Sequence, residues 1–150
     1  MKCKLAIALS VSLGSSIAHA EADARAIESC KAGGKAFTEV AACLPDADVA
    51  YKTLDAFSAI YPQEAQPLKD KCIELNAENI VGAATCVNQA LKTSLDLKAS
   101  LPKGQTLDDN LFAAVSDPEL KSKLDAEIKK AQKLYPEKRL WGGNTYRAYK

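Results

Sequence analysis

Histidine and methionine are almost absent from this 150-residue chain, which has one of each. Both fall within the first twenty residues, as His19 and Met1. From residue 21 onward there is no imidazole, so a Ser-His-Asp triad, a Cys-His pair, a histidine-ligated metal and an ordinary c-type haem site are excluded within that part of one chain. We therefore expect no catalytic residues, no metal and no cofactor.

Long apolar runs are missing as well. No segment offers the roughly twenty apolar residues that a transmembrane helix needs. The first twenty residues have the pattern of a signal peptide instead: Lys2 and Lys4 precede an apolar stretch over residues 5–13, and Ala18-His19-Ala20 provides small residues at a cleavage site. We expect cleavage after Ala20 and a soluble, periplasmic or secreted mature protein that begins at Glu21.

Removal of residues 1–20 also removes Cys3 and leaves an even number of cysteines: Cys30, Cys43, Cys72 and Cys86. In an oxidising compartment these four predict two disulfides. A four-cysteine zinc site usually has ligand pairs two to four residues apart, and this chain does not.

The cysteine spacing leaves two pairing schemes open. A straight helix from Cys30 to Cys43 separates them by roughly 20 Å, whereas a disulfide needs Cα atoms within about 7 Å. Local pairing, Cys30 with Cys43 and Cys72 with Cys86, therefore requires chain reversals, for which Gly33-Gly34 and Asn76 are candidates. We favour this scheme because a duplicated unit should duplicate its bond. The rival is crossed pairing of Cys30 with Cys86 and Cys43 with Cys72.

Apolar residues recur at helical spacing along the whole chain, and no stretch alternates as a strand does. Predicted helices cover residues 21–32, 36–44, 46–61, 67–75, a segment capped by Asn76, residues 107–115, and a last helix opened by a capping box at 116–119. Pro45 is expected to end the second of these. The prediction is an all-α protein of about six helices, with one domain over residues 21–139 and a tail over 140–150.

An internal repeat accompanies the helices. The sequence around Cys43 aligns with that around Cys86, and Tyr61-Pro62, Leu101-Pro102 and Tyr135-Pro136 close three units of about 34 to 40 residues. Ala50, Leu54, Phe57 and Pro62 have the spacing of second-helix positions in tetratricopeptide repeats. The chain thus weakly resembles the tetratricopeptide and Sel1-like families, and this resemblance implies helical hairpins with a protein-binding concave face. A compact helical bundle remains the alternative.

Charge is uneven along the chain. Residues 21–116 have nine Lys or Arg against fourteen Asp or Glu, whereas residues 117–150 have nine against five. The basic end also contains aromatic residues, and such a mixture suits binding to an anionic envelope surface or a protein. The candidate partner-binding residues are Lys138, Arg139, Trp141, Tyr146, Arg147 and Tyr149. The alternative is a tail folded over the domain. Nucleic acid is disfavoured by the compartment.

Catalytic and calcium-binding signals are weak. Glu28-Ser29 matches the Glu-Ser pair of lytic transglycosylases, but the glycine-rich and aromatic motifs of that family are absent. Asp46, Asp48 and Asp108-Asp109 have no surrounding calcium loop and are better explained as helix-start residues. We expect a non-catalytic helical protein that binds an envelope or secreted protein. The alternatives are an inhibitor or immunity protein that neutralises a hydrolase, and a carboxylate-based envelope hydrolase.

Overall fold

A computed structural model of the chain describes residues 21–32, 34–77 and 79–136. The expected leader, the boundary at residue 139 and the tail lie outside this part. Within it there are six α-helices and no strand, which confirms the all-α prediction. The helices are α1 (Ala24–Lys31), α2 (Phe37–Ile60), α3 (Gln66–Asn76), α4 (Ile80–Ser100), α5 (Asn110–Val115) and α6 (Pro118–Gln132), with a 3-10 turn, η1 (Gln63–Ala65), between α2 and α3.

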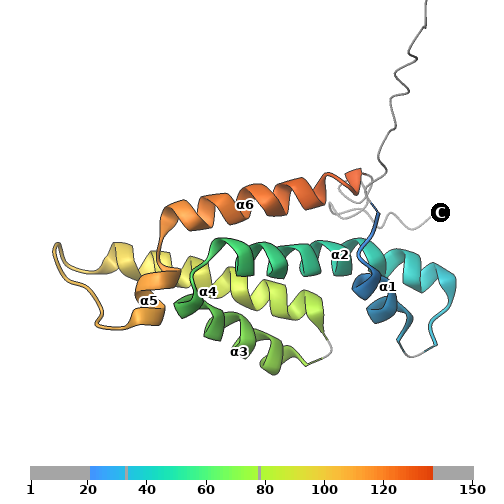
Figure 1. Cartoon of the computed structure of the whole chain (residues 1–150), viewed down its shortest axis with the longest axis horizontal. Helices are drawn as coiled ribbons and strands as arrows, with labels where there is room; N and C mark the ends of the chain where they lie inside the picture. Colours follow the sequence, from blue (N-terminus) through green and yellow to red (C-terminus); the bar gives the residue numbers. More distant parts are fainter. Residues whose placement is uncertain (1–20, 33, 78, 137–150) are drawn as a thin grey trace, which may run out of the picture.

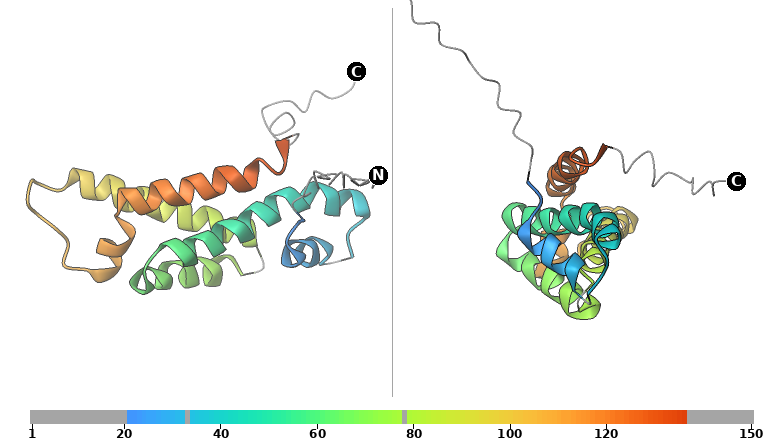
Figure 2. Two further views of the ribbon diagram at one scale, coloured as in Figure 1. Left: turned by 45° about the horizontal axis from the view of Figure 1, so that its top comes forward. Right: turned by 90° about the vertical axis from the view of Figure 1, so that its right-hand side faces the viewer.

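Helix α2 is the centre of the molecule. It contacts α1 near its start, α4 along one side and α6 along another, and α6 runs antiparallel to it (Figures 1 and 2). Helices α3 and α4 form a second hairpin. In a solenoid, each unit packs on the one before it, so α6 would pack on the α3–α4 hairpin. Helix α6 instead packs on α2, which belongs to the first unit. Of the two architectures left open by the sequence, the structure is therefore a compact bundle.

The main core lies between α2, α4 and α6. Its largest fully buried apolar side chains are Phe57, Leu91, Leu124 and Val87. Burial of each such side chain stabilises the folded state by roughly 1.5 to 3 kcal/mol. A smaller cluster of Ala26, Cys30 and Ala47 joins α1 to the first half of α2. The spacing at 3.6 residues per turn thus identified the buried face of α2 at Ala50, Leu54 and Phe57. It failed at the start of the helix, where Phe37, which the same spacing puts on an apolar face with Val40 and Leu44, is 84% exposed.

Both disulfides are local, Cys30–Cys43 and Cys72–Cys86, with Cα atoms 5.7 and 5.6 Å apart. Cys30 lies at the end of α1, yet Cys43 lies almost two turns into α2. The backbone at Ala32 and Ala36 is extended (ψ 134° and 154°) and carries the chain beyond the end of α1. The six residues from the start of α2 to Cys43 then span about 9 Å of helix and bring Cys43 back beside Cys30. The favoured pairing is confirmed.

Pro45 does not end a helix, contrary to prediction. It lies inside α2, which continues to Ile60. An internal proline costs the helix about 3 kcal/mol because it removes one hydrogen bond and crowds the preceding turn. Tertiary contacts on both sides offset this cost: Cys43 is bonded to Cys30 before the proline, and Ala47 and Asp48 are buried directly after it.

Several helix ends also differ from prediction. Asn79, not Asn76, caps α4 by accepting a hydrogen bond from the Gly82 N–H at 2.9 Å. Asp117 alone caps α6 in place of the capping box, and α5 starts at Asn110 because Asp109 caps it. Pro67 does stand in the first turn of α3, as predicted. None of the helices in the described ranges is both long and apolar enough to cross a membrane.

Candidate functional site

Asp48 is the most unusual polar residue of the described chain, because its carboxylate is fully buried. Three donors satisfy it. The Asp23 backbone N–H donates at 2.7 Å, the Tyr135 hydroxyl donates at 2.8 Å, and the Lys52 ammonium forms a short ion pair one turn along α2. These contacts bring the residues that precede α1 and follow α6 to one point on α2.

The donors also set the charge state of Asp48. Burial alone would raise the pKa of this carboxyl, but the hydrogen bonds from Lys52, Asp23 and Tyr135 outweigh burial and leave the pKa below its ordinary value. Burial and the hydrogen bond to Asp48 raise the pKa of Tyr135. Asp48 is therefore an ionised acceptor at neutral pH, unable to act as a general acid.

Arg25 makes a second link between α1 and α2. Its guanidinium donates to Asp23 and to Asp55, and it lies 4.7 Å from the centre of the Tyr51 ring. The hydrogen bond from Arg25 lowers the pKa of Asp23 to about 2. Since the Arg25 side chain is half exposed, solvent weakens these ion pairs. We interpret the Arg25 and Asp48 contacts as structural anchors of α1.

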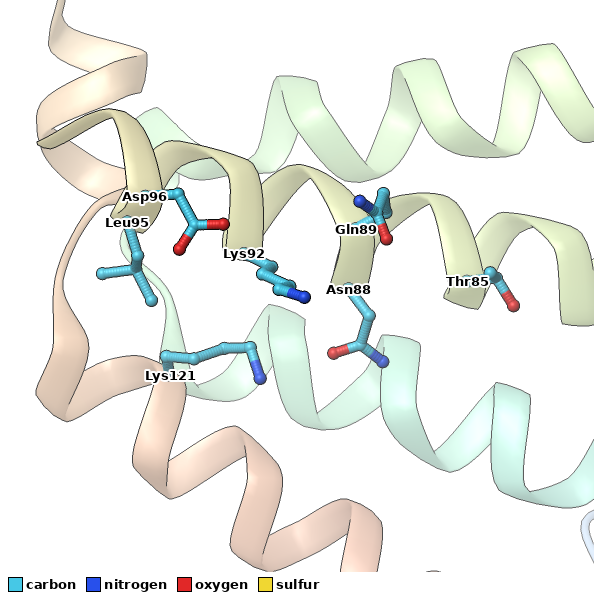
Figure 3. Close-up of a pocket in the computed structure, with 7 residues that line it drawn as sticks. All are labelled: Thr85, Asn88, Gln89, Lys92, Leu95, Asp96 and Lys121. Carbon is cyan, nitrogen blue, oxygen red and sulfur yellow. The ribbon is translucent and has the colours of Figure 1, made fainter. Parts of the chain in front are cut away.

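An open groove lies between α4 and α6 and is the candidate binding site (Figure 3). Its volume is about 380 Å³. Six of its residues follow one stripe of α4, and the seventh comes from α6; they are Thr85, Asn88, Gln89, Lys92, Leu95, Asp96 and Lys121. The groove thus presents amides, a hydroxyl, two ammonium groups, one carboxylate and one apolar side chain.

The charged groups of the groove differ in their pairing. Lys121 is largely covered, with 18% of its side chain exposed, and it donates to Asp125 one turn along α6. Lys92 is exposed, and neither it nor the Asp96 carboxylate forms an ion pair within the described part of the chain. The groove consequently contains unpaired charge of both signs one helical turn apart.

The residues that the sequence singled out do not come together in a catalytic or metal-binding site within the described part of the chain. The four cysteines are consumed in disulfides. Glu28 is 75% exposed and pairs with Lys31 on the surface of α1, which is not an enclosed catalytic environment. No three His, Cys, Asp or Glu side chains of the described residues group as a metal site would require. The partner-binding candidates of the tail, Lys138 to Tyr149, lie outside the described residues.

Sequence reasoning overlooked both features described above. Asp48 was assigned to a helix start, although its position between Ala47 and Ala50 on the buried face of α2 was a signal for a buried acid. No residue of the groove stood out in the sequence as a binding residue. Comparison with known proteins adds no further guide: no family model, no curated protein and no solved structure matches this chain.

Proposed function

We propose that this chain is an exported, non-catalytic protein that binds another protein of the cell envelope or the extracellular space. The observation that carries the proposal is the α4–α6 groove, an open surface with unpaired charged and amide groups. The two local disulfides are consistent with export, since such bonds persist in oxidising compartments.

Chemistry at Asp48, the one fully buried carboxylate of the described residues, is disfavoured. A general acid at neutral pH needs a pKa raised toward 7, and the pKa of Asp48 is lowered. All three donors of Asp48 come from its own chain, and they hold it in the frame. This argues against the carboxylate-based hydrolase that the sequence left as an alternative.

The test is capture from a periplasmic extract with the exported protein as bait, with and without residues 140–150. We expect one envelope or secreted protein to be retained in stoichiometric amount, and less of it when the tail is removed. The same preparation should clear no peptidoglycan. Hydrolysis of peptidoglycan by the purified chain, abolished by replacement of one carboxylate, would overturn the proposal.

A further inference from the structure

The first half of α2 carries an apolar stripe that the described part of the chain leaves largely exposed. Phe37, Ala41 and Pro45 precede the buried Asp48 by eleven, seven and three residues, so they lie on the same face of the helix as Asp48. Phe37 is 84% exposed, Ala41 is exposed and Pro45 is half-buried. These three residues, the α2 stripe, therefore offer apolar area from which a further segment would displace water.

Helix α6 covers the continuation of this face. It packs antiparallel on α2, and just after its end the Tyr135 hydroxyl donates to Asp48 at 2.8 Å. Figure 1 shows the cyan start of α2 extending beyond the end of α6, with only α1 beside it among the described elements. Because the two helices are antiparallel, a chain that continues in the direction of α6 passes over the residues that precede Asp48. The residues after Tyr135 are thus directed along the α2 stripe.

Residues 137–150 have the length that this path requires. Phe37 lies eleven residues before Asp48, which is about 16 Å along the helix at 1.5 Å per residue. Trp141 follows Tyr135 by six residues, and six residues of extended chain reach about 20 Å at roughly 3.3 Å each. Trp141 can therefore reach Phe37.

The small size of the α2 stripe favours a segment of the same chain over a second copy. A stable interface between separate molecules buries about 800 Å² on each partner. An aromatic side chain buries roughly 150 to 250 Å², and the stripe contains one aromatic residue beside an alanine and a proline. A tethered segment needs less contact, because the tether gives it an effective concentration in the millimolar range. The stripe is therefore suited to one tethered aromatic residue and too small for a stable dimer.

We propose that residues 137–150 dock on the α2 stripe, with the Trp141 ring against Phe37. The contact is apolar, since residues 21–52 at this end of the domain have six acidic and four basic residues and attract a basic segment only weakly. Because the contact uses the aromatic ring, the four Lys and Arg residues of the segment remain available to a partner. The inference goes beyond the proposed function and does not depend on it, so failure to capture a partner would leave the tests below unaffected.

Trp141 is the only tryptophan of the chain, so tryptophan fluorescence reports on the proposed contact alone. The emission of the full, disulfide-bonded chain is compared with that of a free peptide of residues 137–150. We expect the chain to emit at a shorter wavelength and to be quenched less by acrylamide, because packing on Phe37 removes the indole from water. Phe37→Ser should weaken docking by roughly tenfold and move the emission toward that of the peptide, since an aromatic pair and its buried area are lost.

The matched control is Leu107→Ser, which should leave the emission unchanged. Leu107 is an exposed leucine of the loop between α4 and α5, and this loop lies at the opposite end of the molecule from the start of α2 (Figure 1). Because Phe37 is so exposed, Phe37→Ser should keep the circular dichroism of the unaltered chain. Emission of the unaltered chain equal to that of the peptide, or equal shifts in the two variants, would overturn the inference.

Ring-current shifts provide a second measurement that leaves Phe37 in place. Trp141→Ala in the full chain should change the chemical shifts of residues 37–45, and changes confined to another surface would contradict the proposed site. The short-wavelength emission should also persist at about 1 M salt, where the Debye length is roughly 3 Å. Its loss there would show that charge holds the segment, and an emission that depends on protein concentration would show that a second copy occupies the stripe; either result refutes the inference.

Discussion

Replacement of Asp48 by Asn is the most informative single change to the fold. The substitution preserves the size of the side chain and one acceptor oxygen, which can still accept from the Asp23 N–H. It replaces the other oxygen by an NH₂ group that faces two donors, the Lys52 ammonium and the Tyr135 hydroxyl. The Tyr135 hydroxyl can turn and accept, but the Lys52 ammonium cannot. One ion pair is lost and one hydrogen bond is weakened.

The expected cost follows from the burial of the site. Hydrogen bonds to a charged group contribute about 1.5 to 3 kcal/mol each, and loss of one partner from a buried pair costs about 3 to 5 kcal/mol. Lys52 is partly exposed, with 31% of its side chain accessible, so water recovers part of the loss. We expect Asp48→Asn to lower the free energy of unfolding by about 3 kcal/mol. For a domain of this size, that corresponds to a Tm lower by roughly 10 °C.

The assay is urea unfolding followed by circular dichroism, with Tyr135→Phe as the graded control. The phenylalanine variant removes one donor and leaves the carboxylate paired with Lys52 and Asp23, so it should cost about half as much. Because the folded-state pKa of Asp48 is lowered, its contribution is complete above about pH 4, the usual range of an unfolded carboxyl, and is lost as the pH falls through the folded pKa. The difference between wild type and Asp48→Asn should therefore shrink on acidification.

Two results would refute this reasoning. A change below about 0.5 kcal/mol for Asp48→Asn would place it among ordinary surface substitutions and show that the buried contacts contribute little. A stability difference that stays unchanged as the pH falls below about 4 would show that the cost comes from packing and not from charge.

Further predictions concern Tyr61, the disulfides and the leader. The Tyr61 hydroxyl is buried without a hydrogen-bond partner among the described residues, so Tyr61→Phe should raise the free energy of unfolding by about 1 kcal/mol in urea titrations. Burial, with Asp117 and Asp125 nearby, raises the pKa of Tyr61 to about 12. Because the folded-state pKa lies above the unfolded value of about 10, the fold should lose stability as the pH rises from about 10 through 12, and the Phe variant should lose less over this range. Replacement of Cys72 and Cys86 by Ala should cost about 3 kcal/mol by the same titration, since the bond closes a loop of about fifteen residues; a change under 1 kcal/mol would contradict this. N-terminal sequencing of the exported protein should begin at Glu21, and a start at Met1 would remove the argument for export.

The buried face of α2 beyond Pro45 was predictable because it depends on local periodicity. Val49, Leu54 and Phe57 stand at helical spacing, and the structure buries Leu54 and Phe57 in the main core. The disulfide pairing was predictable from the duplication around Cys43 and Cys86. The prediction at Pro45 is wrong because a local rule, that proline ends a helix, is outweighed by the Cys30–Cys43 disulfide before it and by the burial of Ala47 and Asp48 after it. Both depend on the packing of α1 against α2.

The Asp48 contacts were beyond sequence reasoning for a different reason. Asp48 and Tyr135 are 87 residues apart, and nothing in the spacing of either residue indicates the other. Their contact depends on the antiparallel alignment of α6 on α2, which brings the end of α6 back to the first half of α2. The groove likewise depends on how far α6 diverges from α4, a property of tertiary packing.

The two ends of the domain share one attachment point. Asp23 and Tyr135 both bond to Asp48, whereas Lys121 lies about 20 Å away along α6. A pull between Asp23 and Tyr135 therefore acts directly on the hydrogen bonds at Asp48. Asp48 is thus one of the contacts that hold the two ends of the described domain together, and Asp48→Asn should lower the force at which a single molecule first opens.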